Sequence, residues 1–319
     1  MKKRFSFGSG LNVLMVLLSL GGISNEARAD DVSVSWNGAR ALKDIQTLVA
    51  FGPRAEGTPG LAKARDFIVA VLRTAGIAEP LFQKGTITTA DGTVRSLVNL
   101  IGRWNPEAPR RIILATHYDS IVRAYRDKRT PDAPMPGANN GGSGVAVLLE
   151  TLRVLHALPK PLTVGVDFVF FDGEEGPAAL GAGDPHWSPL GSTLFAHEQL
   201  DALYPTGQRP EGAVVVDMVC DRDLALRPEG HSLQAAPKET RRFWDIGTRL
   251  APSAFTLKPT RFPINDDHVP LIQAGIPAFL VIDFDYEPFY NTTADTPDKC
   301  STTSLEAVGR TLTAYLTGL

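Results

Sequence analysis

The chain has 319 residues, 43% of them hydrophobic, with 32 Lys and Arg against 35 Asp and Glu and a formal net charge of −3 at pH 7. This balance provides no general attraction to nucleic acid or anionic lipid, so we expect no nucleic-acid partner. Two cysteines are too few for a disulfide scaffold or a CxxC zinc ribbon, so any metal would have to be bound by His and carboxylate side chains. Pairing of Cys220 with Cys300 stays open, because the sequence does not place their Cα atoms within bonding range.

The first 29 residues have the features of an export signal. A basic start at residues 2–4 precedes an apolar run at 11–20, and an Ala-Arg-Ala cleavage signal ends before Asp30. We therefore expect a signal peptide at 1–29, one mature domain at 30–319, and a secreted or periplasmic protein. The apolar run is shorter than the roughly 20 residues that span a bilayer, so we expect no stable membrane insertion after cleavage.

Apolar patterns along the mature chain predict alternating helices and strands. Thr58 is a plausible N-cap, and apolar residues recur at helical spacing from there until Gly76. Helical patterns also lie at 144–158, 192–203 and 238–250, and a capping box at 303–306 predicts a final helix. Runs rich in Val, Ile and Phe without polar alternation predict buried strands at 111–116, 164–171, 213–219 and 278–282. This order predicts a three-layer α/β fold, in which helices flank a twisted, mostly parallel sheet.

Polar residues follow three of these strands at their carboxyl ends, the edge where open α/β sheets bind ligands. His117 and Asp119 follow the first strand, Glu174 and Glu175 follow the second, and Asp217 ends the third. A single loop acid is usually solvated, but acids on successive strand ends favour a shared site. Neighbouring side chains of an extended segment point in opposite directions, so one glutamate could bind a cation while the other transfers protons. Asp119 is placed to orient the His117 imidazole.

Five segments, in order along the chain, resemble the zinc exopeptidase superfamily. They are THYDS at 116–120, GANNGGSG at 137–144, FFDGEE at 170–175, WSP at 187–189 and DDHVP at 266–270. This superfamily includes di-zinc aminopeptidases and glutaminyl-peptide cyclotransferases, and FDGEE, WSP and DDHVP resemble the cyclotransferase branch. The resemblance extends from Phe51 to the C-terminus. It implies a mixed sheet between helices and a peptide or N-terminal amino acid as the substrate.

The sequence departs from this family at the zinc ligands. In the cyclotransferases an Asp, a Glu and a His hold one zinc ion, and the corresponding residues here are Asn140, Glu175 and Asn291. Because neutral amides are poor zinc ligands, we expect an empty or weak zinc site. A metal displaced towards His117, Asp217 and Glu175, with His186 as a further recruit, stays an alternative. Deamidation of Asn140 before Gly141, which would restore a carboxylate, is a second alternative.

The resemblance also implies roles for the remaining residues. Glu174 would carry a proton from the α-amine of an N-terminal Gln to the departing ammonia, with Asp217 and Asp266 supporting the transfer. A metal on Glu175 would polarise the γ-amide carbonyl. The substrate pocket would be formed by Trp187, by Tyr290 in place of a family Trp, and by His268, which we expect to hold its loop rather than act as a base.

Three functions remain open at this point. The first is an exported cyclotransferase-like enzyme with an altered metal site, which forms pyroglutamate and releases ammonia. The second is a metal-dependent aminopeptidase or amidohydrolase of the same superfamily, in which Glu174 activates water. The third is a binding protein that keeps the pocket and has lost the chemistry. The retained acids favour the first two, and the two asparagines favour the third.

Overall fold

The computed structural model describes residues 35–175, 187–204 and 208–319. The expected signal peptide at 1–29 and His186 lie outside these residues. None of the described helices is both long and apolar enough to cross a membrane.

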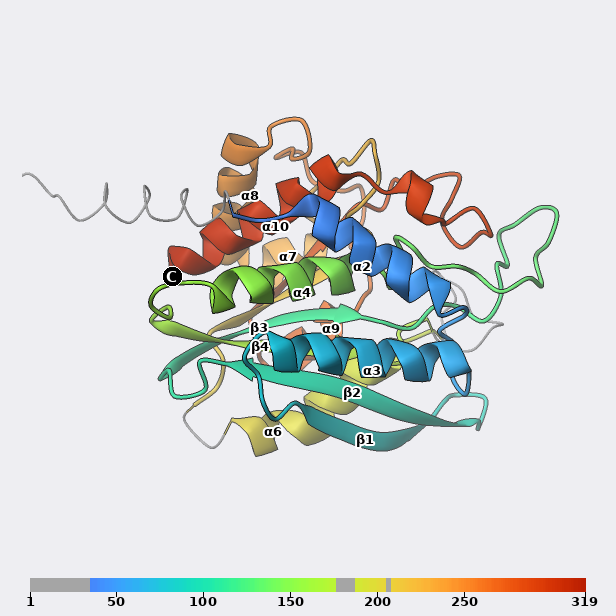
Figure 1. Cartoon of the computed structure of the whole chain (residues 1–319), viewed down its shortest axis with the longest axis horizontal. Coiled ribbons are helices and arrows are strands. Elements are labelled where there is room, and N and C mark those ends of the chain that lie inside the picture. The colour runs from blue at the N-terminus through green and yellow to red at the C-terminus, as the bar shows by residue number, and fades with distance from the viewer. Residues whose placement is uncertain (1–34, 176–186, 205–207) are drawn as a thin grey trace, which may run out of the picture.

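The described residues form a six-stranded sheet in the order β1-β2-β4-β3-β5-β6 (Figure 1). The central and outer strands β3 (Arg110–His117), β4 (Val164–Phe171), β5 (Gly212–Asp217) and β6 (Ala278–Ile282) run parallel. The pair β1 (Leu81–Thr88) and β2 (Val94–Trp104) is antiparallel, and β2 also pairs antiparallel with β4. The predicted mostly parallel, mixed sheet is therefore confirmed, although β1 and β2 were not among the predicted strands.

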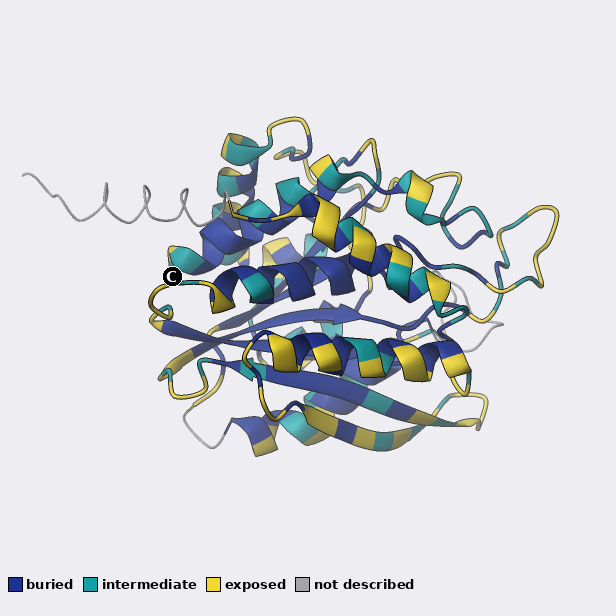
Figure 2. Cartoon of the chain, viewed as in Figure 1, coloured by how far each residue is buried: buried dark blue, intermediate teal, exposed yellow. Residues whose placement is uncertain are grey.

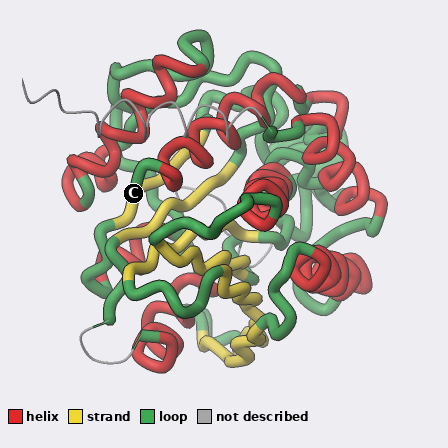
Figure 3. Tube along the Cα trace, turned by 60° about the vertical axis from the view of Figure 1, so that its left-hand side comes forward, coloured by secondary structure: helices red, strands yellow, loops and turns green. Residues whose placement is uncertain are grey.

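Helices cover both faces of the sheet, because its central strands are apolar on both sides (Figure 3). One face, which carries Ile112 and Leu114, packs against α2 (Gly38–Ala50), α3 (Pro59–Thr74), α4 (Ser143–His156), α8 (Pro237–Leu250) and α10 (Thr302–Thr317). The other face, which carries Ile113 and Ala115, packs against the helical segment 190–203 and α9 (His268–Gln273). Figure 2 shows the buried strands between these layers. The remaining short helices are α7 (Gly230–Ala235) and the 3-10 turn η2 (Pro297–Lys299).

Several predicted boundaries hold, and others shift for local reasons. Helix α3 begins after Thr58, whose side chain accepts a hydrogen bond from the Leu61 amide at 3.3 Å. Strand β5 ends at Asp217 rather than at residue 219, because Met218 has a φ of 44° that no strand accommodates. The N-cap of α10 is Ser301, whose hydroxyl accepts from the Ser304 amide, so the predicted capping box at 303–306 is wrong.

The predicted helix at 192–203 is instead a chain of three short elements. It consists of α5 (Leu190–Leu194), the π-helical turn η1 (Phe195–Gln199) and α6 (Leu200–Leu203). A π-turn adds a residue within a helix and shifts its buried face. Phe195 and Leu203 thereby both reach the core beneath the sheet.

Candidate active site

The carboxyl ends of β4, β3 and β5, which are neighbours in the sheet, bring the predicted acids to one pocket. Twelve residues from these strand ends and the nearby loops line it, namely Asn140, Glu174, Glu175, Trp187, Asp217, Met218, Ile264, Asn265, Asp266, Ile282, Phe284 and Tyr290. The pocket therefore combines carboxylates with an aromatic and aliphatic wall.

His117 lies beneath this pocket and is held between two carboxylates. Its Nδ1 atom is 3.2 Å from Asp119 Oδ1, and its Nε2 atom is 3.1 Å from Asp217 Oδ1. Burial opposes protonation of the imidazole, but the charges of Glu174 and Asp217 outweigh burial and raise its pKa well above the usual value. An imidazolium in this position offsets part of the negative charge of the cluster.

Asp119 positions the two glutamates as well as the imidazole. Its Oδ1 atom accepts a hydrogen bond from the Glu174 amide at 3.2 Å, and its Oδ2 atom accepts one from the Glu175 amide at 3.1 Å. Burial, followed by the charges of nearby acids, raises the pKa of Glu174 well above its usual value. Glu174 is therefore a buried acid with a fixed backbone and a raised pKa, which makes it a candidate for proton transfer.

At the family's zinc positions, Asn140 is hydrogen-bonded to both of the other residues. Asn140 Nδ2 donates hydrogen bonds to Glu175 Oε1 and, at 3.0 Å, to Asn291 Oδ1. Asn291 Nδ2 in turn donates to the Tyr125 hydroxyl at 3.3 Å. All three residues of this amide bridge, Asn140, Glu175 and Asn291, are buried. Burial raises the pKa of Glu175 to about 8.

These residues do not fit a zinc ion. An amide nitrogen that carries hydrogens has no lone pair for a metal, and Asn140 turns this nitrogen towards both other residues. The alternative ligands His117 and Asp217 are in direct contact, with Nε2 3.1 Å from Oδ1, and Glu175 lines the same pocket as Asp217.

The loop before α9 supplies Asp266 to the pocket. Asp266 Oδ1 accepts a hydrogen bond from the Asp267 amide at 2.6 Å, and burial together with the charge of Asp217 raises the Asp266 pKa well above its usual value. The structure places His268 outside the residues that line the pocket, because its Nε2 atom contacts Glu229 Oε1 at 3.1 Å in the interior. Burial alone would raise the pKa of Glu229, but hydrogen bonds from His268 and Ser232 outweigh it and lower this pKa to about 2.

The pocket wall is aromatic on two sides. Trp187 lines the pocket and donates from Nε1 to the Glu174 carbonyl at 3.1 Å, which ties this wall to the loop that carries the glutamates. The Tyr290 ring lies 5.9 Å from the Phe284 ring, centroid to centroid, and the Arg126 guanidinium lies 5.1 Å over its face. These contacts orient the Tyr290 side chain beside Asn291 and the carboxylates.

Two buried charged residues that the motifs did not indicate hold the loop of Asn140. Arg54 is fully buried and donates to the Tyr118, Pro136 and Gly137 carbonyls at 2.6–2.9 Å. Asp295 accepts from the Asn140 amide at 3.1 Å on the opposite side of the loop. Both residues act through contacts with distant segments, which no local sequence pattern records.

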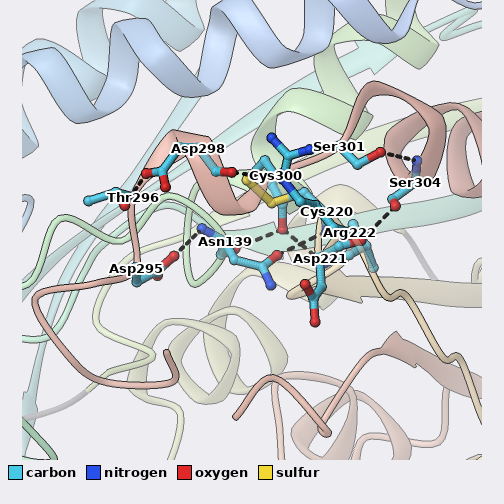
Figure 4. The surroundings of a disulfide bond; sticks show 12 residues. Asn139, Cys220, Asp221, Arg222, Asp295, Thr296, Asp298, Cys300, Ser301 and Ser304 are labelled. Carbon is cyan, nitrogen blue, oxygen red and sulfur yellow. Dashed lines mark hydrogen bonds between the residues drawn. A yellow bond between two sulfur atoms is a disulfide. The ribbon is translucent and has the colours of Figure 1, made fainter. Parts of the chain in front are cut away.

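A disulfide closes the back of the site. Cys220, just after β5, is bonded to Cys300 in the segment before α10 (Figure 4). The Cys220 amide donates to Asn139 Oδ1 at 3.0 Å, and the Asn139 amide donates to Asp295 Oδ1 at 2.8 Å. The disulfide therefore joins β5, the Asn140 loop and the C-terminal segment, and the pairing that the sequence left open is present.

Comparisons with known proteins agree with this fold. The family model described as Peptidase family M28 matches residues 99–316. The glutaminyl-peptide cyclotransferase of Bos taurus is 24% identical and covers 94% of this chain and 86% of its own length. The glutaminyl cyclase structure from Fimbriiglobus ruber has a TM-score of 0.80 at 31% identity, covering 89% of this chain and 96% of its own. A leucine aminopeptidase precursor from Bacteroides thetaiotaomicron also has a TM-score of 0.80, at 25% identity, covering 88% of this chain and 97% of its own.

Proposed function

We propose that this chain, which belongs to peptidase family M28 and resembles glutaminyl cyclases, cyclises the N-terminal glutamine of peptides to pyroglutamate. The observation that carries the proposal is the buried Glu174 carboxyl beside Asp217 and Asp266 in one pocket. In the reaction the α-amine nitrogen attacks the γ-amide carbon of the same residue. The bond from that carbon to the amide nitrogen then breaks, and ammonia leaves.

Glu174 would move the proton that this reaction transfers. It would accept a proton from the attacking α-amine and deliver it to the departing nitrogen, so the carboxyl is unchanged at the end of the cycle. Burial raises the pKa of Glu174, which favours its acting as the acid that protonates the departing nitrogen. Asp217 and Asp266, which line the same pocket, would hold the α-amine through hydrogen bonds.

No step in this proposal uses a metal, because the amide bridge does not fit one. The Tyr290 hydroxyl is a neutral donor in the pocket wall, and burial raises its pKa further above its usual value of 10, so it stays protonated. It would donate a hydrogen bond to the γ-carbonyl oxygen as negative charge develops there. A single neutral donor stabilises such charge by less than a metal ion does, so we expect slow turnover.

Ammonia release from a peptide with N-terminal Gln tests the proposal. Glu174→Gln removes the proton carrier with little change in shape and should lower kcat by about 10²-fold or more, the usual size of a general acid and base contribution. Glu198→Gln, a change at an exposed glutamate outside the pocket, is the matched control and should leave kcat unchanged. Release of a free amino acid instead of ammonia would identify an aminopeptidase.

A second function, peptide binding without turnover, is favoured by one observation. The amide bridge fills the zinc positions with a stable hydrogen-bond network that provides no strong electrophile. Peptide binding measured by fluorescence anisotropy, with no ammonia released over hours, would support this function over cyclisation.

We also propose export, with a mature chain that begins near Asp30. The disulfide supports this location, because disulfides persist in oxidising compartments. The intact mass of protein recovered from the periplasm or medium tests it. A mass that includes residues 1–29 would contradict cleavage.

A further inference from the structure

A second, larger cavity opens directly beside the candidate pocket. It has a volume of about 410 Å³ and shares two lining residues, Ile264 and Phe284, with the pocket. The segment 258–262 forms much of its wall, with Arg227 and Asp285 at its edge. We refer to this cavity as the basic groove. The shared residues make the groove a continuation of the pocket.

The chemistry of the groove differs from that of the pocket. Its aromatic side chains are open to solvent, with Phe262 64% exposed and Phe284 43% exposed. It is also lined by three cationic residues, Arg227, Lys258 and Arg261, against one acid. That acid, Asp285, is 3.6 Å from Arg227 and pairs with it. The groove is therefore positive and apolar beside a pocket lined with carboxylates, in a chain whose net charge is −3.

Hydrogen bonds of Thr260 hold one wall of the groove in shape. The Thr260 amide donates to the Pro228 carbonyl at 3.0 Å, and the Thr260 hydroxyl donates to the Phe262 carbonyl at 2.8 Å. These bonds fix the loop that presents Lys258, Arg261 and Phe262. A preformed site loses less conformational freedom when a ligand binds, so this loop lowers the entropic cost of binding in the groove.

We propose that the basic groove binds the residues that follow the N-terminal residue of an acidic peptide substrate. This inference rests on the proposed function, which places the N-terminal residue in the pocket. An extended chain that leaves the pocket passes Phe284, which lines both cavities, and continues along the groove past Lys258 and Arg261. An apolar second side chain packs on the exposed rings, and downstream carboxylates pair with the cations. Because the carboxyl groups of the pocket hold the α-amine and the cations of the groove attract downstream carboxylates, the two sites together set the direction of the peptide.

The test compares two labelled peptides, Gln-Phe-Asp-Asp and Gln-Phe-Lys-Lys, each carrying a fluorophore at its C-terminus. Fluorescence anisotropy at low salt should show about tenfold tighter binding of the acidic peptide, and the difference should shrink as salt screens the charges. The double variant Lys258→Glu/Arg261→Glu should reverse the preference. The control Lys43→Glu/Lys160→Glu changes the net charge equally at exposed residues outside the groove and should keep the preference.

Anisotropy separates this inference from the proposed function, because it reports binding whether or not ammonia is released. Tight, charge-selective binding without turnover would support the groove and contradict cyclisation. The dipeptide amide Gln-Gly-NH2 is too short to reach the cations of the groove. If the protein releases ammonia from this dipeptide, the kcat/KM of the reaction should therefore be unaffected by the double variant. Equal affinities of the wild-type protein for the two labelled peptides, or an unchanged preference in the Lys258→Glu/Arg261→Glu variant, would overturn the inference.

Discussion

Replacing Asn140 by Asp tests whether the amide bridge holds the site together without a metal. The change removes the two hydrogen bonds donated by Nδ2 and puts a carboxyl against Glu175 Oε1. A buried hydrogen bond to a charged group contributes about 1.5–3 kcal/mol to the free energy of unfolding, and one between neutral groups contributes about 1 kcal/mol. Losing both hydrogen bonds should therefore lower the free energy of unfolding by about 3 kcal/mol. In a chain of this size each kcal/mol corresponds to about 2 °C, so the melting temperature should fall by about 6 °C.

Thermal unfolding in EDTA is the assay, run at pH 6 and pH 9. The loss for Asn140→Asp should be smaller at pH 6, where the new carboxyl and Glu175 can share a proton, and larger at pH 9, where both are ionised. Asn37→Asp, at an exposed N-cap where both residue types accept the same bond, is the control. Wild-type protein should melt at the same temperature with EDTA and with zinc.

The double variant Asn140→Asp/Asn291→His completes the test, because it restores the family's ligand types. Zinc at 100 times its Kd would stabilise this variant by about 2.7 kcal/mol. The reasoning would be refuted if EDTA lowered the melting temperature of the wild type, or if Asn140→Asp were as stable as the wild type in EDTA at pH 9.

Three further predictions concern the framework of the site. Burial, with the charge of Asp119, raises the folded-state pKa of Asp172 to about 7. The protonated Asp172 side chain therefore stabilises the folded state fully below pH 4, and this contribution is lost as the pH rises through 7. The denaturant concentration at the unfolding midpoint should fall from pH 5 to pH 8, and it should fall less steeply in Asp172→Asn. Arg54→Met should cost about 3–5 kcal/mol by leaving buried carbonyls unpaired, whereas Arg110→Met, which breaks a surface pair with Glu211, should cost under about 1 kcal/mol. Reducing Cys220–Cys300, which closes a loop with a sequence separation of 80, should cost about 4 kcal/mol, measurable by denaturant unfolding with and without dithiothreitol.

The parts of the fold that the sequence predicts are those in which local pattern and burial agree. Strands β4 and β6 are rich in Val, Ile, Leu and Phe and are buried along their whole length, and their predicted bounds match the structure. Strand β1 was missed, because its edge position leaves residues such as Lys84 and Thr86 outside the core, which weakens the apolar signal. The cap of α10 was misplaced because Ser301 and Thr303 are both plausible caps by residue type alone.

In the candidate site, too, local patterns predict some residues, and others depend on tertiary contacts. Glu174, Asp217 and Asp266 could be predicted to meet, because each follows a strand or lies in a motif whose order along the chain is informative. The hydrogen bonds that Arg54 makes across more than 60 residues of sequence depend on the folded backbone, and no local pattern records them. His268 was assigned to the pocket by its neighbours in sequence, and its burial against Glu229 comes from a tertiary contact.

The amide bridge has a consequence for inhibitor design. Compounds that gain affinity by coordinating a catalytic metal through an imidazole or hydroxamate have no partner where Asn140 donates to Glu175 and Asn291. Selective ligands for this chain would instead carry a primary amine for the carboxylates and an acidic tail. Such compounds would separate it pharmacologically from zinc-containing relatives in the same sample.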